Sequence, residues 1–474
     1  MKTLRSGAVA RRLLASWLAA MLLAGCASVP VVEPMVAPPP PIAFRDADGR
    51  WAAVAPAEAQ ARGEWWKVFA DPILDDLVAR ADRQSTSIQV AAARLAEARA
   101  LLRGADARRL PQLGVAAGAA RQSGLPGSGV PAQAQTIADV GVSASWEPDL
   151  FGRIAQASRA AVLDVEARAA LLQSTRLLVQ SDVADAYFTL RALDVERALV
   201  RETVAAYRDT LRLTERRHQA GDVAELDLVR VQAEVAATES QALSIDRRRA
   251  EIEHAIALLV AEPASDFRVA EAAWSDMLPN VPAGVPSTVL ARRPDVSAAQ
   301  RSMLAAQARV GVAQKAWFPD LTLTASGGVA SSDLGELFRW SARSWGIGML
   351  LSLPVFDGGR REAGVQGAAA QWDAAAAAYR EQVLTVFRDV EDQLSALRLL
   401  AEQATAQTQA VDAASRATVL SNARYRNGYV SQLELLDARR SELANRRQAL
   451  QVRAARYRAT VGLIRALGGG WSAA

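Results

Sequence analysis

The sequence predicts a mixed α and β fold in which short strands are set between very long helices, and in which this arrangement occurs twice along the chain. Three observations lead to this prediction. Landmark residues recur at a nearly constant spacing, four short segments alternate apolar with small or polar residues, and two long runs contain no proline. The first observation indicates an internal duplication, the second indicates strands, and the third indicates long helices.

The duplication rests on matching landmarks in the two halves. Residues 110–113 (Leu-Pro-Gln-Leu) correspond to residues 318–321 (Phe-Pro-Asp-Leu), with their prolines 208 positions apart. Residues 146–153 correspond to residues 353–360, with their phenylalanines 205 positions apart. We therefore expect a first repeat over residues 44–261, an equatorial connecting segment over residues 262–293, a second repeat over residues 294–466, and a C-terminal tail over residues 467–474.

Four segments are expected to form strands, over residues 112–122, 136–147, 320–331 and 343–354. The last, for example, places Trp345, Ile347 and Met349 on one face and serine or glycine on the other. Each segment has about the length that a tilted strand needs to cross a bilayer. A soluble β-sandwich is the alternative, but it requires more than four strands. The smallest membrane barrels have about eight strands, and an open sheet edge is not tolerated in lipid, so several copies must pool their strands. Two copies would supply eight and three would supply twelve.

Long helices are expected between the strand pairs. Residues 152–218 and 359–426 contain no proline, and each run predicts a helix roughly 100 Å long. Gly221 and Gly428, 207 positions apart, stand where a helix end favours a left-handed residue. The chain then turns back into two further helices, expected over residues 223–260 and 431–466.

The helices are expected to pack side by side as a wall. Apolar residues recur every seven positions, as in a coiled coil, for example at Ala376, Val383, Val390 and Leu397. A simple dimerising coiled coil is the alternative, and the strands argue against it. Shorter helices are expected over residues 79–108 and 294–316. Residues 262–291 are expected to be irregular. With residues 44–76 and the C-terminal tail, they are expected to form a belt around the helical wall, in which Trp65, Trp66 and Phe69 pack and Asp71-Pro72 begins a helix.

The N-terminus predicts export and lipidation. Residues 1–25 have a basic start and an apolar run too short for a permanent membrane anchor, as in a signal peptide. They end in Leu-Ala-Gly before Cys26, which resembles the bacterial lipoprotein signal, so we expect a covalent diacylglycerol and N-acyl lipid (palmitate) on Cys26. This is the single cysteine of the chain, which excludes an internal disulfide. A proline-rich tether is expected over residues 26–43.

Charge and composition argue against nucleic-acid binding and against catalysis. The formal net charge is +4, and residues 1–25 contain four basic residues and no acids, so the mature chain is neutral. The only histidines, His218 and His254, lie far apart and lack cysteine partners, so neither a zinc site nor a histidine-dependent nucleophile is expected. No nucleotide-binding loop is present. We therefore expect neither an enzyme nor a cofactor-dependent protein, and the energy for transport must come from another protein.

Several motifs together resemble those of the TolC-like outer-membrane efflux lipoproteins of the OprM/NodT type. They are the lipoprotein signal ending at Cys26, residues 65–72, residues 146–152, residues 293–296 and residues 353–359. The resemblance implies a homotrimer with a twelve-stranded outer-membrane β-barrel continued by a twelve-helix periplasmic tube. It also implies two partners, a periplasmic adaptor (membrane fusion protein) and an inner-membrane resistance-nodulation-division (RND) pump. The expected function is a passive exit channel for small molecules. The alternatives are the exit duct of a type I secretion system and a non-conducting, lipid-anchored coiled-coil scaffold.

The resemblance also implies a gate at the periplasmic end of the helices. In the family, acidic and apolar residues just after the second hairpin glycine narrow the pore. In this sequence these positions are Leu433, Glu434 and Asp437, with Arg440 and Tyr425 as residues that could hold Asp437 in a closed mouth. The alternative is that Glu434 and Asp437 are solvated charges and that Leu433 packs in a helix seam. The hairpin tips expected to contact the adaptor are Gly221, Asp222, Asn427 and Gly428.

Overall fold

The structure, a computed structural model, describes residues 45, 63–122, 134–272, 274, 278–279, 281 and 286–469. The predicted signal peptide, Cys26 and the proline-rich tether lie outside these residues. The chain divides into two compact units. Unit 1 includes residues 94–169 and 298–380, and unit 2 includes residues 38–93, 170–297 and 381–474.

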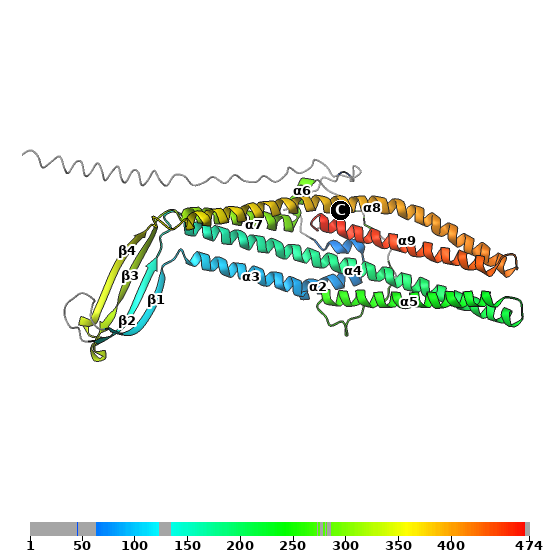
Figure 1. The fold of residues 1–474 in the computed structure, drawn as a ribbon, viewed down its shortest axis with the longest axis horizontal. Coiled ribbons are helices and arrows are strands. Elements are labelled where there is room, and N and C mark those ends of the chain that lie inside the picture. Colours follow the sequence, from blue (N-terminus) through cyan, green and yellow to red (C-terminus); the bar gives the residue numbers. More distant parts are fainter. Residues whose placement is uncertain are drawn as a thin grey trace, which may run out of the picture. The chain divides into compact units, whose positions relative to one another are not determined.

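Unit 1 contains a four-stranded antiparallel sheet with the strand order β1-β2-β3-β4 (Figure 1). The strands are β1 (Gln112–Gln122), β2 (Gln135–Trp146), β3 (Asp320–Ser331) and β4 (Arg343–Ser352). They lie within two residues of the ranges expected from the alternation. β4 ends before Leu353-Pro354, because proline has no N–H to donate to a strand ladder. Two short 3-10 turns, η3 (Leu334–Glu336) and η4 (Trp340–Ala342), connect β3 to β4.

The longest helices are α4 (Arg153–Gln219) and α8 (Arg360–Arg426), each of 67 residues. α4 turns back into α5 (Glu225–Leu259), and α8 turns back into α9 (Gln432–Ala466), so each pair forms a helical hairpin in unit 2 (Figure 1). The seven-residue column is buried at Ala376, Val383 and Val390 and half-buried at Leu397. Apolar spacing therefore identified the packed side of α8.

One of the two expected shorter helices is divided in the structure. Instead of one helix over residues 79–108, the chain forms α2 (Pro72–Gln84) and α3 (Thr86–Ala107). α2 begins at Pro72, as predicted for Asp71-Pro72. Asp71 Oδ1 accepts hydrogen bonds from the N–H groups of Ile73 and Leu74, and Pro72 occupies the first turn. Ser85 leaves the helical conformation (φ −54°, ψ 125°), and its carbonyl accepts the first hydrogen bond of α3.

The connection between the repeats was expected to be irregular to residue 291, but it contains a short helix, α6 (Pro286–Arg292). This helix precedes α7 (Pro294–Lys315), whose first residue is again a proline. A seven-residue helix gives too weak a periodic signal to be recognised in a segment that also contains several prolines.

An aromatic cluster packs the start of the described chain against the long helices of unit 2. Trp65, Trp66 and Phe69 of η2 (Trp65–Phe69) are buried, which confirms the predicted packing role. Phe69 lies 4.8 Å, ring centre to ring centre, from Phe188 of α4, which in turn lies 4.9 Å from Tyr457 of α9. Burial of several aromatic side chains supplies much of the free energy that holds such a helical layer together.

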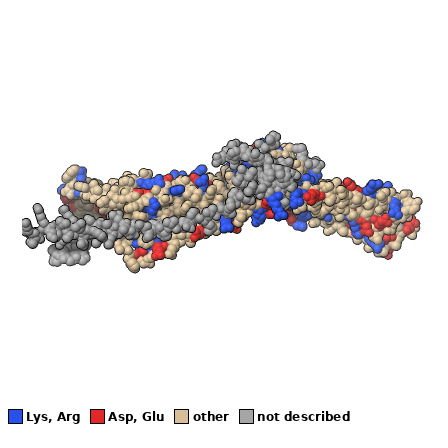
Figure 2. Space-filling view, turned by 90° about the horizontal axis from the view of Figure 1, so that it is seen from above, with Lys and Arg blue, Asp and Glu red and all other residues tan. Residues whose placement is uncertain are grey.

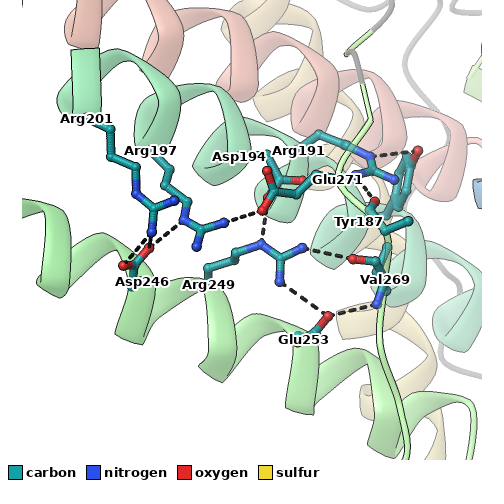
Figure 3. A network of polar contacts seen from close by, with 11 residues as sticks. Tyr187, Arg191, Asp194, Arg197, Arg201, Asp246, Arg249, Glu253, Val269 and Glu271 are labelled. Atoms are coloured by element: carbon teal, nitrogen blue, oxygen red, sulfur yellow. Dashed lines mark hydrogen bonds and ion pairs between the residues drawn. The ribbon is translucent and has the colours of Figure 1, made fainter.

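A buried ionic network joins the α4–α5 hairpin to the segment after α5 (Figure 3). Arg191 is 1% exposed, bonds to Asp194 (2.9 Å), and donates to the carbonyl of Ala270 (2.7 Å). From α5, Arg249 donates to Asp194 Oδ1 (2.6 Å) and to the carbonyl of Val269 (2.9 Å). Because a buried charge without its partners is costly, these bonds specify one path for residues 269–270 across the hairpin.

Candidate functional site: the apolar sheet face and the helical hairpin ends

One face of the sheet is apolar across all four strands. It is exposed on the edge strands β1 and β4 and half-buried over much of β2 and β3. The register pairs Val115 with Val142, Ala325 with Ile347, and Leu323 with both Trp146 and Met349 on this face. The apolar residues of this face are Leu113, Val115, Ala117, Ala119, Ala138, Val140, Val142, Ala144, Trp146, Leu321, Leu323, Ala325, Val329, Trp345, Ile347, Met349 and Leu351. Large side chains of β1 and β4 on this face are mostly exposed. Such a continuous apolar surface is stable only against an apolar environment.

The opposite face of the sheet carries mainly small and polar side chains, with Leu350 of β4 as a large apolar exception. It includes Gly114, Ser143, Ser326, Gly346 and Asp139, which alternate with the apolar set along the same strands. At the β2–β3 pair, a Cβ on Gly328 would lie 2.5 Å from the carbonyl oxygen of Val140, so only glycine fits this close strand approach. The two faces thus differ in polarity, as the walls of a water-filled barrel require.

Neither edge of this sheet is paired with another strand of the described chain. β1 and β4 are the terminal strands of the order, so their outer N–H and C=O groups have no ladder partner there. An apolar face with two unpaired edges is not tolerated in a bilayer unless further strands cover the edges. Among the described residues, no helix combines the length and hydropathy needed to cross a membrane.

The two hairpin ends in unit 2 have the same backbone geometry. Gly221 and Gly428 adopt φ values of 79° and 78°, the left-handed conformation expected from their residue type. Gly221 N–H donates to the carbonyl of His218 (2.9 Å), and Gly428 N–H donates to the carbonyl of Tyr425 (3.0 Å). Asp222 and Asn427 beside them are exposed. All four predicted tip residues therefore lie at the turns.

Three of the predicted gate residues lie on the solvent side of the first turns of α9. Leu433, Glu434 and Asp437 are exposed, and Glu434 forms an ion pair with Arg424 of α8 (3.6 Å). Leu226 of α5 occupies the position 207 residues before Leu433 and is likewise exposed. Acidic and basic side chains gather around these hairpin ends, at the right of Figure 2.

Arg440 connects Asp437 to the other hairpin. Its Nη1 lies 3.3 Å from Asp437 Oδ1, and its Nη2 forms an ion pair with Glu234 of α5. The Glu234 side chain is 14% exposed, whereas those of Asp437 and Arg440 are 60% and 53% exposed. The hydrogen bond that Arg440 donates to the Glu234 carboxylate is the main cause that raises the pKa of Arg440. Arg440 is therefore held more firmly by Glu234 than by Asp437.

Tyr425 does not lie with Asp437 in this structure. It is 6% exposed, and its ring faces Arg217 of α4, whose guanidinium carbon is 5.7 Å from the ring centre. The Tyr425 hydroxyl accepts a long hydrogen bond from Arg217 (3.4 Å). The structure thus brings Asp437 together with Arg440 and places Tyr425 in the packing between α8 and α4.

Buried polar contacts between α9 and α4 were not anticipated from the sequence. Gln432 Nε2 donates to Thr214 Oγ1 (2.8 Å), and Arg439 Nη1 donates to Thr210 Oγ1 (2.7 Å). Burial lowers the pKa of Arg439, whose nearest acceptors are neutral. The Tyr207 hydroxyl, beside them on α4, is buried without a hydrogen-bond partner, and burial raises its pKa to about 12. In the sequence, only the spacing of Thr210 and Thr214, one helical turn apart, could have indicated these polar contacts on α4.

Comparison with known proteins agrees with this geometry. The family profile described as "Outer membrane efflux protein" matches residues 77–262 and 285–469. The chain is 33% identical over 462 residues to the pyoverdine export outer membrane protein OpmQ of Pseudomonas aeruginosa, covering 96% of each chain. It is 32% identical over 463 residues to the toluene efflux pump outer membrane protein TtgI of Pseudomonas putida, covering 96% of this chain and 97% of TtgI. The solved outer-membrane channel OprN superposes with a TM-score of 0.85 at 30% identity, over 93% of this chain and 99% of that one.

Proposed function

The chain belongs to the outer membrane efflux protein family, and from this premise we propose that three copies form one channel with a twelve-stranded barrel in the outer membrane. The channel is the exit duct of an efflux system. The observation that carries the trimer is the four-stranded sheet, which has one apolar face and two unpaired edges. Three such sheets joined edge to edge satisfy every backbone group that would otherwise face lipid.

Transport through the channel is passive. The family consists of transport channels and not of enzymes. Two of its relatives are named for the export of pyoverdine and of toluene, which supports small organic molecules as the cargo. We propose that an inner-membrane RND pump selects the cargo and supplies the energy. A periplasmic adaptor would join the pump to the hairpin ends at Gly221, Asp222, Asn427 and Gly428.

The gate lies at the start of α9. In a threefold assembly, Leu433 and Asp437 would each form a ring around the axis, because each is exposed and occurs once per copy. The Asp437 ring would favour cations, and the Arg440–Glu234 ion pair would hold α9 against α5 in the closed state. Outward movement of the α8–α9 hairpin would then open the mouth.

The proposed sequence boundaries complete the arrangement. Residues 1–25 are the signal peptide, Cys26 carries the lipid, and residues 26–43 tether the lipid to the first repeat. The protein is thereby anchored in the outer membrane and extends into the periplasm. The two repeats, over residues 44–261 and 294–466, contribute two strands and one long hairpin each.

Reconstitution in a planar bilayer tests the proposal. Mature protein that forms discrete conducting steps supports the channel. Protein that stays monomeric and never conducts, even after the gate is loosened by substitution, would reject it in favour of the scaffold. A type I secretion duct has no specific support here, because the named relatives export small molecules.

A further inference from the structure

We propose that the exposed Val355-Phe356 pair of one copy docks into a cavity beside Leu110 of the neighbouring copy, where it closes the periplasmic end of the joint between the two sheets. This proposal rests on the proposed assembly of several copies and specifies the contact between them. The partner is a second copy of this chain. All the residues involved belong to unit 1.

The Val355-Phe356 pair forms an apolar projection that its own chain leaves uncovered. The two side chains are 93% and 90% exposed. They lie on the loop between β4 and α8, which is held in place at Asp357. Asp357 Oδ1 accepts a hydrogen bond from Gly359 N–H (3.1 Å), and Asp357 Oδ2 accepts one from Arg361 Nε (2.7 Å). A fixed loop that exposes two large apolar side chains indicates a contact surface.

The electrostatics of the same loop support a fixed conformation. Burial would raise the pKa of Asp357, but the hydrogen bonds from Arg361 and Gly359 lower it below its ordinary value. The Arg361 guanidinium also lies over the ring of Trp317, 4.5 Å from its centre. The loop is therefore tied both to the start of α8 and to the segment before β3.

A cavity lies at the start of β1, on the opposite edge of the sheet. It has a volume of about 490 Å³ and a mixed lining. The large apolar residues are Leu110, Trp146, Ile154 and Val312, and the polar residues include Gln112, Ser145, Glu147, Arg153 and Thr322. The Trp146 indole is fixed by a hydrogen bond from its Nε1 to the carbonyl of Arg109 (2.9 Å). Leu110 is mostly exposed, so the apolar wall of the cavity can be reached from outside the chain.

The internal repeat indicates which residue of a neighbouring copy the Phe356 ring would contact. Within the chain, Phe151 follows β2 and Phe318 precedes β3, and their rings stack with centres 5.0 Å apart. The repeat matches Phe151 with Phe356 and Phe318 with Leu110. Phe356, however, follows an edge strand, and Leu110 precedes the other edge strand, so neither has this partner in its own copy.

Joining two copies supplies the missing pair. When β4 of one copy lies antiparallel to β1 of the next, the end of β4 meets the start of β1, as the end of β2 meets the start of β3 within the chain. The faces also agree. Leu351 and Met349 of β4 and Leu113 and Val115 of β1 all belong to the apolar face, and only registers that keep this match are compatible with lipid. The contact is head-to-tail, so it repeats around a closed ring.

Cysteine cross-linking tests the contact in the full-length, membrane-inserted protein. The double variant Phe356→Cys with Leu110→Cys is treated with a short bis-maleimide, and the products are separated on a denaturing gel. We expect most chains to appear as covalent dimers and trimers, and each single variant to remain uncross-linked. The chain without added cysteines controls for Cys26. A matched control pairs Leu110→Cys with Phe338→Cys, a similarly exposed aromatic residue on the connection between β3 and β4.

The outcomes separate this inference from the proposed function. Cross-linked species from the first pair alone support the docking contact. Trimers that form normally, as judged on native gels, but do not cross-link through the first pair would overturn the contact and leave the channel assignment intact. A chain that stays monomeric in the membrane would overturn both. As an independent check, Phe356→Ala is expected to lower the temperature at which trimers separate, whereas Phe338→Ala leaves it unchanged.

Discussion

The Arg440–Glu234 ion pair leads to a quantitative prediction about the gate. Glu234→Gln removes the carboxylate that holds α9 against α5 and leaves the shape of the side chain almost unchanged. Glu234 is mostly buried and Arg440 is half exposed, so solvent screening places the loss at about 1–2 kcal/mol per chain. A difference of this size changes the open-to-closed ratio by a factor of about 5–30 per chain.

Leak conductance in planar bilayers measures this change directly. We expect channels formed by the Glu234→Gln variant to open spontaneously and far more often than the wild type. Glu239→Gln is the matched control, because Glu239 lies on the same helix and pairs with Arg208 of α4, within the α4–α5 hairpin (2.6 Å). Equal leak in the two variants and the wild type would refute the role of this ion pair in closing the gate.

Three further predictions follow from the same structure. Asp437→Ala should raise the leak less than Glu234→Gln, because the Asp437–Arg440 pair is exposed and contributes about 0.2–1 kcal/mol. The difference in leak from the wild type should shrink in high salt, and an unchanged leak at low salt would count against a role of this pair in the gate. Tyr207→Phe should keep or increase the thermal stability, because the buried hydroxyl has no partner, and it should reduce the loss of stability in alkali. Because the pKa of Tyr207 is raised to about 12 in the folded protein, its contribution to the free energy of unfolding is complete below about pH 10 and is lost as the pH passes about 12. Circular dichroism melts of both proteins across this range provide the test, and equal losses of stability in alkali would contradict the prediction. Gly328→Ala should prevent assembly of trimers that survive on denaturing gels without heating, because its Cβ would clash with the carbonyl of Val140. Gly327→Ala, whose added Cβ would meet open space, should assemble normally, and trimers in both variants would show the clash to be relieved.

Sequence patterns predicted the sheet well, because its strands have one apolar face. Alternation with period two assigns every side chain to a face, and the observed register keeps Val115, Val142 and Ile347 together with the other apolar residues. Glycine also marked the hairpin ends, since Gly221 and Gly428 both adopt the left-handed conformation. These features are local, so a single sequence contains them.

Contacts between distant helices could not be predicted in the same way. The sequence suggested Tyr425 and Arg440 as partners of Asp437, but the structure places Tyr425 against Arg217 and pairs Arg440 also with Glu234, which lies 206 positions away. Which residue of α4 or α5 faces α9 depends on how the helices rotate and slide against one another, and the heptad pattern fixes this only to within a turn. The helical pattern did not locate the break at Ser85, because the bond that begins α3 runs from Gln89 N–H to the backbone carbonyl of Ser85, which any residue can supply.

The number of chains in one channel tests the central claim most directly. Native mass spectrometry of the mature protein, released from lipid after conductance has been recorded, would count the chains. We expect a single species with the mass of three lipidated chains. A conducting species with the mass of one chain would contradict the proposal, because four strands cannot close a pore in a membrane.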